Sequence, residues 1–183
     1  MDNGASSYRR YLDGDQNAID EIMEELFFSL VFFLDRYVHN VHTAEDLAMD
    51  TITDLLVHRH RYNFKVSLKT YVFLLGKSRA LNYLRQRNRH PTLELHEAET
   101  AEAEEDELET RVLDAERKRV VNAALARLPE DMRIAVHLVF FEELSYEEAA
   151  RVMGKNKKQV DNLLYRAKNQ LRTILGAEGV ELL

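Results

Sequence analysis

The chain has 183 residues, which is enough for one domain of ordinary size or for two small ones. It contains only 6 Gly and 2 Pro, whereas these residues make up roughly 12% of an average protein. This scarcity argues against sandwiches, barrels and α/β folds, which need many turns. The absence of Cys excludes a disulfide framework, a thiolate zinc site and a cysteine nucleophile. The longest apolar run, residues 26–34, is too short to cross a bilayer, which needs about 20 residues. We therefore expect an all-α, soluble protein of the cytoplasm without membrane insertion.

The net charge of −7 comes from one short segment. Residues 91–110 contain nine Asp or Glu and no Lys or Arg. Repelling carboxylates with few large apolar neighbours favour a solvated linker or a weak helix. We therefore predict two small helical domains, at 1–90 and 112–183, joined by an acidic flexible linker at 91–111.

Basic residues gather in both predicted domains. No acid occurs between Asp54 and Glu94, where there are nine Lys or Arg, and the segment from Arg151 to Arg172 has seven basic residues against the single acid Asp161. A charge run is often only a solvated helix face. Two runs, one in each domain, favour a polyanion such as nucleic acid that is held at two places.

Apolar residues at helical spacing predict one long helix, or two in close succession, over about 17–41. Thr43 precedes Asp46 by three residues and is the expected N-cap of the next helix. On that helix Asp46, Asp50 and Asp54 form a stripe, although like charges at i, i+4 repel each other. The stripe is either a solvated face or an acidic docking strip for a basic partner surface.

A loop is expected over 60–68, followed by a helix over about 68–88 with a very basic end. Aromatic residues lie among the cations, and bases of a single strand commonly stack on such residues beside a cationic groove. Tyr62 and Phe64, in the loop, are the better candidates for stacking. Tyr71, Phe73 and Tyr83 are expected mainly in the hydrophobic core.

In the second domain we expect helices over 112–128 and 132–141. Ser145 and Glu148 form the capping box of a short helix that ends near Gly154. Asn156 is the expected N-cap of a last helix over 157–175. The expected buried stripe of that helix is Val160, Leu164, Ala167, Leu171 and Ile174.

The last two helices are joined by a turn that contains glycine, the pattern of a helix-turn-helix. Many helical hairpins with this spacing bind nothing. If the second helix enters a major groove, Gln and Asn can bind adenine there, and Lys or Arg can bind guanine or phosphate. The polar residues of this helix off the apolar stripe include Lys157, Lys158, Gln159, Asn162, Arg166 and Lys168.

Patterns for catalysis or metal binding fail on inspection. Residues 76–78, Gly-Lys-Ser, resemble the end of a phosphate-binding loop, but the required first glycine would fall on Tyr71. His39 and His42 could share a helix face, yet the spacing suggests no third metal ligand. We therefore expect neither an enzyme nor a cofactor.

Two blocks of sequence resemble a known family. Residues 44–89 combine an Ala-Glu-Asp-Leu helix, a loop, a Ser-Leu-Lys-Thr-Tyr start and a basic helix end. Residues 124–172 combine Leu-Pro, an Arg, the segment Leu-Ser-Tyr-Glu-Glu-Ala, a glycine turn and a helix with Arg-Ala before its last Leu. In order and spacing they resemble regions 2 and 4 of bacterial RNA polymerase sigma factors, in the extracytoplasmic-function group of the primary-type sigma superfamily.

The resemblance implies a factor that binds core RNA polymerase and directs initiation at promoter DNA, with an anti-sigma factor as a possible further partner. It implies that core polymerase is bound by Asp46, Leu47, Asp50 and Asp54. It implies that −10 DNA is bound by Arg59, Arg61, Tyr62, Asn63, Phe64, Lys65, Ser67, Lys69, Lys77, Arg79, Asn82 and Arg85. It implies that −35 DNA is bound by Lys155, Asn156, Lys157, Lys158, Gln159, Asp161, Asn162 and Arg166.

Two residues depart from the family pattern. Tyr71 stands where the family often has Trp, and Asp161 stands where a basic residue is frequent. An acid cannot favour a phosphate, but it can accept a hydrogen bond from a cytosine amino group. The alternatives to a sigma factor are a stand-alone helix-turn-helix regulator and a helical adaptor protein that does not bind DNA.

Overall fold

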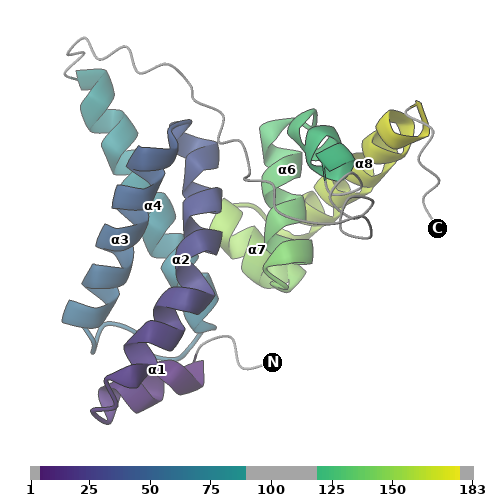
Figure 1. The fold of residues 1–183 in the computed structure, drawn as a ribbon. Coiled ribbons are helices and arrows are strands. Elements are labelled where there is room, and N and C mark those ends of the chain that lie inside the picture. Colours follow the sequence, from purple (N-terminus) through teal and green to yellow (C-terminus); the bar gives the residue numbers. More distant parts are fainter. Residues whose placement is uncertain (1–4, 90–118, 178–183) are drawn as a thin grey trace, which may run out of the picture. The chain divides into compact units, whose positions relative to one another are not determined.

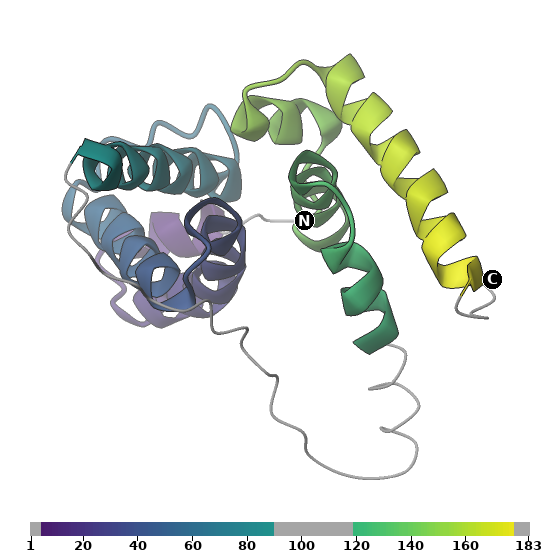
Figure 2. The same cartoon turned by 90° about the horizontal axis from the view of Figure 1, so that it is seen from above.

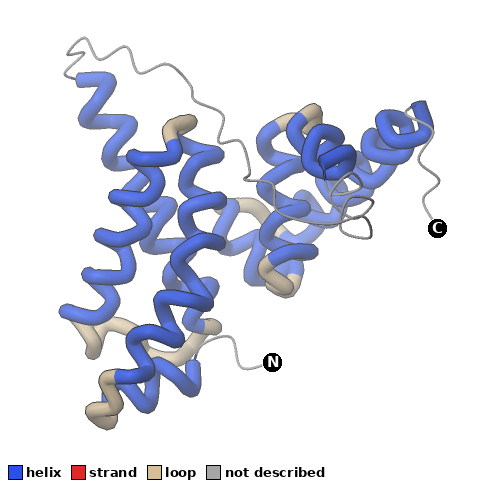
Figure 3. The backbone as a smooth tube through the Cα atoms, viewed as in Figure 1, coloured by secondary structure: helices blue, strands red, loops and turns tan. Residues whose placement is uncertain are grey.

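The computed structural model describes residues 5–89 and 119–177. The chain divides into two compact units, residues 1–100 (unit 1) and 101–183 (unit 2), each with its own core. Every regular element in the described ranges is helical, as Figure 3 shows, so the predicted all-α class is confirmed. The predicted linker at 91–111 lies outside the described residues.

Unit 1 consists of α1 (Ala5–Leu12), α2 (Asn17–Val38), α3 (Val41–Val57) and α4 (Leu68–Arg89). The three long helices pack against one another, and α1 packs on α2 (Figure 1). The helix predicted over 68–88 is confirmed as α4, whereas α1 was not anticipated from the sequence. A loop over 58–67 joins α3 to α4, and it is the longest connection in the described part of the chain.

The core of unit 1 is built on one stripe of α2. Leu26, Leu30 and Phe33 are fully buried there, and the ring of Phe33 lies 4.8 Å from that of Phe73 on α4 in an edge-on contact. Gly76 lies in the same contact, because a Cβ on this residue would approach Leu30 Cδ1 to 2.9 Å. Close packing of α4 on α2 therefore explains the glycine that resembles a phosphate-binding motif.

The boundary between α2 and α3 differs from the prediction. His39 ends α2 in the left-handed region, with φ of 52°. The N-cap of α3 is Asn40, whose side-chain oxygen accepts a hydrogen bond from the Thr43 amide at 2.8 Å. The prediction of Thr43 as the cap is wrong, because Asn is the stronger N-cap residue and Thr43 lies in the first turn. His42 lies in α3, so His39 and His42 do not share one helix.

Unit 2 contains a helical segment over 119–126, then α6 (Glu130–Val136), η1 (His137–Phe141, a π-helix), α7 (Tyr146–Met153) and α8 (Lys157–Ala177). The helix expected over 112–128 is described only from residue 119. α8 packs on both α6 and α7, and Figure 2 shows its full length. The helix predicted over 132–141 is confirmed by α6 and η1 together.

The predicted helix boundaries around the turn are confirmed. Ser145 and Glu148 form both hydrogen bonds of a capping box at the start of α7. Gly154 ends α7 in the left-handed region, with φ of 71°. Asn156 Oδ1 accepts from the Gln159 amide at 2.9 Å, and Gln159 Oε1 accepts from the Asn156 amide at 2.8 Å, so the two side chains cap α8 reciprocally. Of the predicted stripe, Leu171 is half-buried and the rest are buried: Val160, Leu164, Ala167 and Ile174.

Candidate nucleic-acid interface

The acidic stripe of α3 has two exposed members. Asp46 and Asp50 lie on the solvent side, with half-buried Leu47 beside them and Met49 exposed between them. In the described residues no cation pairs with either carboxylate. This surface, which we call the acidic strip, is open to a basic partner.

Asp54, the third residue of the stripe, has a different environment. Its side chain is only 17% exposed, and its Oδ1 lies 2.9 Å from His58 Nδ1, 3.4 Å from Arg79 Nη2 and 3.7 Å from Arg61 Nη1. These contacts join the end of α3 to the 58–67 loop and to α4. Asp54 is therefore engaged inside unit 1 and is not part of the exposed acidic strip.

The loop over 58–67 is folded around a buried aromatic ring. Tyr62 is only 4% exposed, and its hydroxyl donates to the Val66 carbonyl at 2.6 Å. Its ring centroid lies 4.6 Å from that of Phe64 and 5.2 Å from that of Tyr71. The expectation that Tyr62 presents its face to a DNA base is corrected, because this ring is the core of the loop. Phe64 is half-exposed, with φ of 59°, and remains the stacking candidate.

Several of the other predicted −10 residues make local hydrogen bonds. Ser67 Oγ accepts from the Thr70 amide at the start of α4, and Asn63 Oδ1 accepts from the Lys65 amide. Arg85 Nη2 donates to Asn82 Oδ1 at 2.7 Å on the outer face of α4. The exposed ones are Arg59, Arg61, Asn63, Lys65, Asn82 and Arg85, and the half-buried ones are Ser67, Lys69, Lys77 and Arg79.

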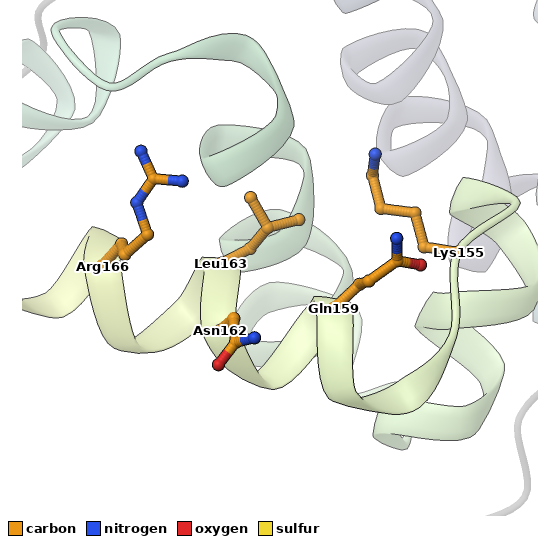
Figure 4. Close-up of a pocket in the computed structure, with 5 residues that line it drawn as sticks. All are labelled: Lys155, Gln159, Asn162, Leu163 and Arg166. Atoms are coloured by element: carbon orange, nitrogen blue, oxygen red, sulfur yellow. The ribbon is translucent and has the colours of Figure 1, made fainter.

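The predicted −35 residues lie at the start of α8 and in the turn before it. A surface hollow is lined by Lys155, Gln159, Asn162, Leu163 and Arg166, and Figure 4 shows that the Asn162 side chain points away from the side on which the other four lie. All eight predicted residues are exposed except Lys155, which is half-buried. The structure therefore gathers them on one helix end but on more than one of its faces.

Some of these side chains are already engaged within unit 2. Lys157 Nζ donates to Glu147 Oε1 at 2.6 Å, and this bond raises the pKa of Lys157 and lowers the pKa of Glu147. Lys155 Nζ lies 3.0 Å from Asp131 Oδ2. In contrast, Lys158 and Asn162 have no hydrogen bond or ion pair with any described residue. Together with exposed Arg166, which has no such contact either, they are available donors for a nucleic acid on this helix.

Tyr165 was missed by the sequence reasoning. It is 69% exposed and follows Lys158, Asp161 and Asn162 by seven, four and three residues. Residues at these spacings form one stripe on a helix. The stripe lies opposite the buried residues Val160 and Leu164, so helical periodicity alone could have identified Tyr165.

The described residues contain no group of three or more His, Asp or Glu side chains arranged to hold a metal ion. No helix among them combines the length and the apolar character that a membrane span requires.

Comparisons with known proteins agree with this arrangement. The family model for sigma-70 region 2 matches residues 29–90, and the model for sigma-70 region 4 matches residues 118–171, together more than half of the chain. The chain is 24% identical to the ECF RNA polymerase sigma factor SigM of Bacillus subtilis, over 85% of this chain and 94% of that protein. It is 27% identical to the RNA polymerase sigma-H factor of Pseudomonas aeruginosa, over 86% of each.

Solved structures support the fold. The sigma factor RpoE of Bartonella quintana, crystallised with the anti-sigma factor NepR, superposes with a TM-score of 0.62 at 21% identity, over 86% of this chain and 96% of that one. CnrH, solved in complex with the cytosolic domain of CnrY, gives a TM-score of 0.57 at 18% identity, over 96% of each chain.

The chain belongs to the sigma-70 family of RNA polymerase sigma factors, in its extracytoplasmic-function (ECF) group. Sigma factors are transcription initiation factors and not enzymes, and they bind core RNA polymerase and promoter DNA. The resemblance identified from the two sequence blocks is therefore confirmed. Membership of the family does not by itself assign a role to any individual residue of this chain.

Proposed function

We propose that this sigma factor directs core RNA polymerase to promoters by recognising a −10 element with residues 1–90 and a −35 element with residues 112–183. The observation that carries the proposal is the pair of acid-poor basic surfaces, one around α4 and one on α8. Surfaces of this kind bind the phosphate backbone, and side chains at base edges then supply specificity. The acidic segment at 91–111 would join the two parts.

In the first part, half-exposed Phe64 offers a ring face for an unstacked base of the −10 element. Base stacking on an aromatic side chain contributes about 1–3 kcal/mol. Arg59, Arg61 and Lys65 lie within six residues of it and are exposed, so the strand that carries the base meets positive charge. This combination supports capture of a single strand and not of an intact duplex.

In the second part, the stripe of Lys158, Asp161, Asn162 and Tyr165 faces away from the core of unit 2. Asn can bind adenine with two hydrogen bonds, and the Asp carboxylate can accept from a cytosine amino group. Tyr165 can place its ring against a thymine methyl group. Lys155 and Arg166, at the edges, are suited to phosphates.

Docking on core RNA polymerase is proposed for the acidic strip, Asp46 and Asp50 with Leu47. The repulsion between two carboxylates at i, i+4 costs the isolated helix stability, and a basic partner surface would reverse that cost. Asp54 contributes less in this proposal, because its carboxylate is already surrounded by His58, Arg61 and Arg79. The site of action is the cytoplasm, where the polymerase is found.

Regulation by an anti-sigma factor is also proposed. It is supported by the RpoE structure, in which a sigma factor with this fold is bound to the anti-sigma factor NepR. Such a partner would compete with polymerase or with DNA for the surfaces described above.

Reconstitution tests the proposal. The purified chain is mixed with bacterial core RNA polymerase, and initiation is measured on a library of double-stranded promoters with randomised upstream sequence. Selection of two separated sequence elements supports the proposal. DNA binding without co-migration with polymerase would favour the stand-alone regulator, and the loss of both activities would favour the adaptor protein.

A further inference from the structure

The short helix α1 precedes the part of the chain that the region 2 family model matches, residues 29–90. Its contacts nevertheless lead directly to the 58–67 loop, which lies beside it in Figure 1. Tyr8 is fully buried, and its hydroxyl lies 3.0 Å from the Leu55 carbonyl and 2.9 Å from the Arg59 carbonyl, to which it donates. Tyr11 donates to the Leu56 carbonyl at 2.9 Å.

Two of these carbonyls, those of Leu55 and Leu56, lie in the last turn of α3 and need external donors. The last carbonyl groups of an α-helix have no partner within the helix. α3 ends at Val57, and its C-cap residue is His58 with φ of −98°, so the helix lacks the left-handed cap that often satisfies these groups. The two tyrosine hydroxyls of α1 therefore complete the end of α3 at the point where the loop begins.

The rings of α1 also support the loop itself. Tyr8 lies 5.5 Å from Tyr62 in an edge-on contact and 6.2 Å from Phe64. The Arg9 guanidinium carbon lies 5.0 Å from the centre of the Phe64 ring. The half-exposed ring of Phe64 is thus held by the loop core and by α1.

α1 is anchored independently of the loop. Arg10 binds both Asp15 and Glu21, with nitrogen–oxygen distances of 2.6 and 2.8 Å, and Ser7 Oγ donates to Glu21 at 2.8 Å. These contacts fix α1 on the start of α2. Burial, with smaller contributions from Tyr11 and Tyr71, raises the pKa of Tyr8 to about 12, so its hydroxyl keeps its proton at any physiological pH.

We propose that α1 positions the DNA-capture loop and that Tyr8 is the positioning residue, since its hydroxyl ties the end of α3 and the Arg59 turn to a helix anchored on α2. The inference rests on the proposed capture of −10 DNA by the loop. It makes α1 a determinant of −10 recognition through its contacts with the loop.

The test uses full-length chain reconstituted with core RNA polymerase and compares Tyr8→Phe with wild type. This change removes the hydroxyl and keeps the ring. The probe is a fluorescent single-stranded oligonucleotide that carries the −10 sequence selected in the promoter library. Loss of one buried hydrogen bond corresponds to about tenfold weaker binding of this probe. Affinity for core polymerase and for a −35 duplex should not change.

Two control variants accompany it. Tyr146→Phe removes a half-buried tyrosine hydroxyl in unit 2 that makes no hydrogen bond in the described chain, and it should leave probe binding unchanged. Phe64→Ala tests the loop directly. Hydrogen exchange of the free chain adds a measurement without DNA: in Tyr8→Phe the Arg61 amide, which donates to the His58 carbonyl, should exchange faster.

The outcomes separate the two proposals. If Phe64→Ala weakens probe binding and Tyr8→Phe does not, the role of Tyr8 is overturned and the function of the loop stands. If wild type shows no preference for the −10 strand, both are overturned. If Tyr8→Phe weakens polymerase, duplex and probe binding equally, Tyr8 is a general structural residue and the positioning role is overturned.

Discussion

The two proposed DNA-binding regions obtain their shapes in different ways. The stripe on α8 is presented by a regular helix, and it requires only a buried stripe, a capping pair and the glycine turn before it. The loop over 58–67 has no regular structure, and it is held by Tyr8, Asp54 and its own buried Tyr62. A residue far from the DNA can therefore impair the loop, whereas the binding of α8 should depend on α8 itself and on residues in direct contact with its start.

The largest expected effect concerns the binding of the chain to core polymerase, on which both DNA-binding regions depend. Asp46→Arg places a cation opposite a basic partner surface, and like-charge contacts cost several kcal/mol, so we expect about 100-fold weaker binding to core polymerase. A pull-down with titrated polymerase measures it. The matched control is Asp13→Arg, an exposed acid in the turn after α1. An unchanged affinity for Asp46→Arg would remove the acidic strip from the interface.

The second effect should be confined to α8. Lys158→Ala combined with Asn162→Ala removes two donors that have no partner in the described chain, and each good base contact contributes about 1–3 kcal/mol. We expect about 30-fold weaker use of the −35 element, measured by footprinting the reconstituted holoenzyme. The circular dichroism spectrum should not change, because both side chains are exposed. A wild-type footprint would contradict the assignment.

A smaller effect should appear in the loop alone. Asp54→Asn weakens the contacts to His58, Arg61 and Arg79 and leaves the exposed acidic strip intact. We expect about threefold weaker capture of a single −10 strand with polymerase affinity unchanged, in keeping with the modest strength of partly exposed ion pairs. Loss of polymerase binding would instead return Asp54 to the docking surface.

The smallest effect should strengthen binding. Glu147→Gln releases Lys157 from its 2.6 Å ion pair, so one more cation becomes available to phosphate. We expect about twofold tighter duplex binding and a salt slope that is steeper by about one. Titrations at several salt concentrations measure both. A slope identical to that of wild type would mean that Lys157 does not reach the backbone.

The sequence was more informative for α8 than for the loop. The capping box, Gly154, the Asn156 cap and the buried stripe were all predictable, because each is a local pattern over a few residues. The role of α1 was not predictable, since its tyrosine hydroxyls donate to carbonyls 45 to 51 residues away in the sequence. The burial of Tyr62 was missed for the same reason: its neighbours Tyr8 and Tyr71 come from two other helices. The sequence also could not show that Asp54 pairs with Arg79 while Asp46 stays exposed, because Arg79 lies on another helix.

The most direct measurement is a promoter-library selection with three reconstituted holoenzymes: wild type, Phe64→Ala, and the variant with Lys158→Ala and Asn162→Ala. The wild type should select two elements. Phe64→Ala should lose sequence preference only at the −10 element, and the α8 variant only at the −35 element. Loss of preference at the same element in both variants, or at neither, would contradict the division of promoter recognition between the loop and α8.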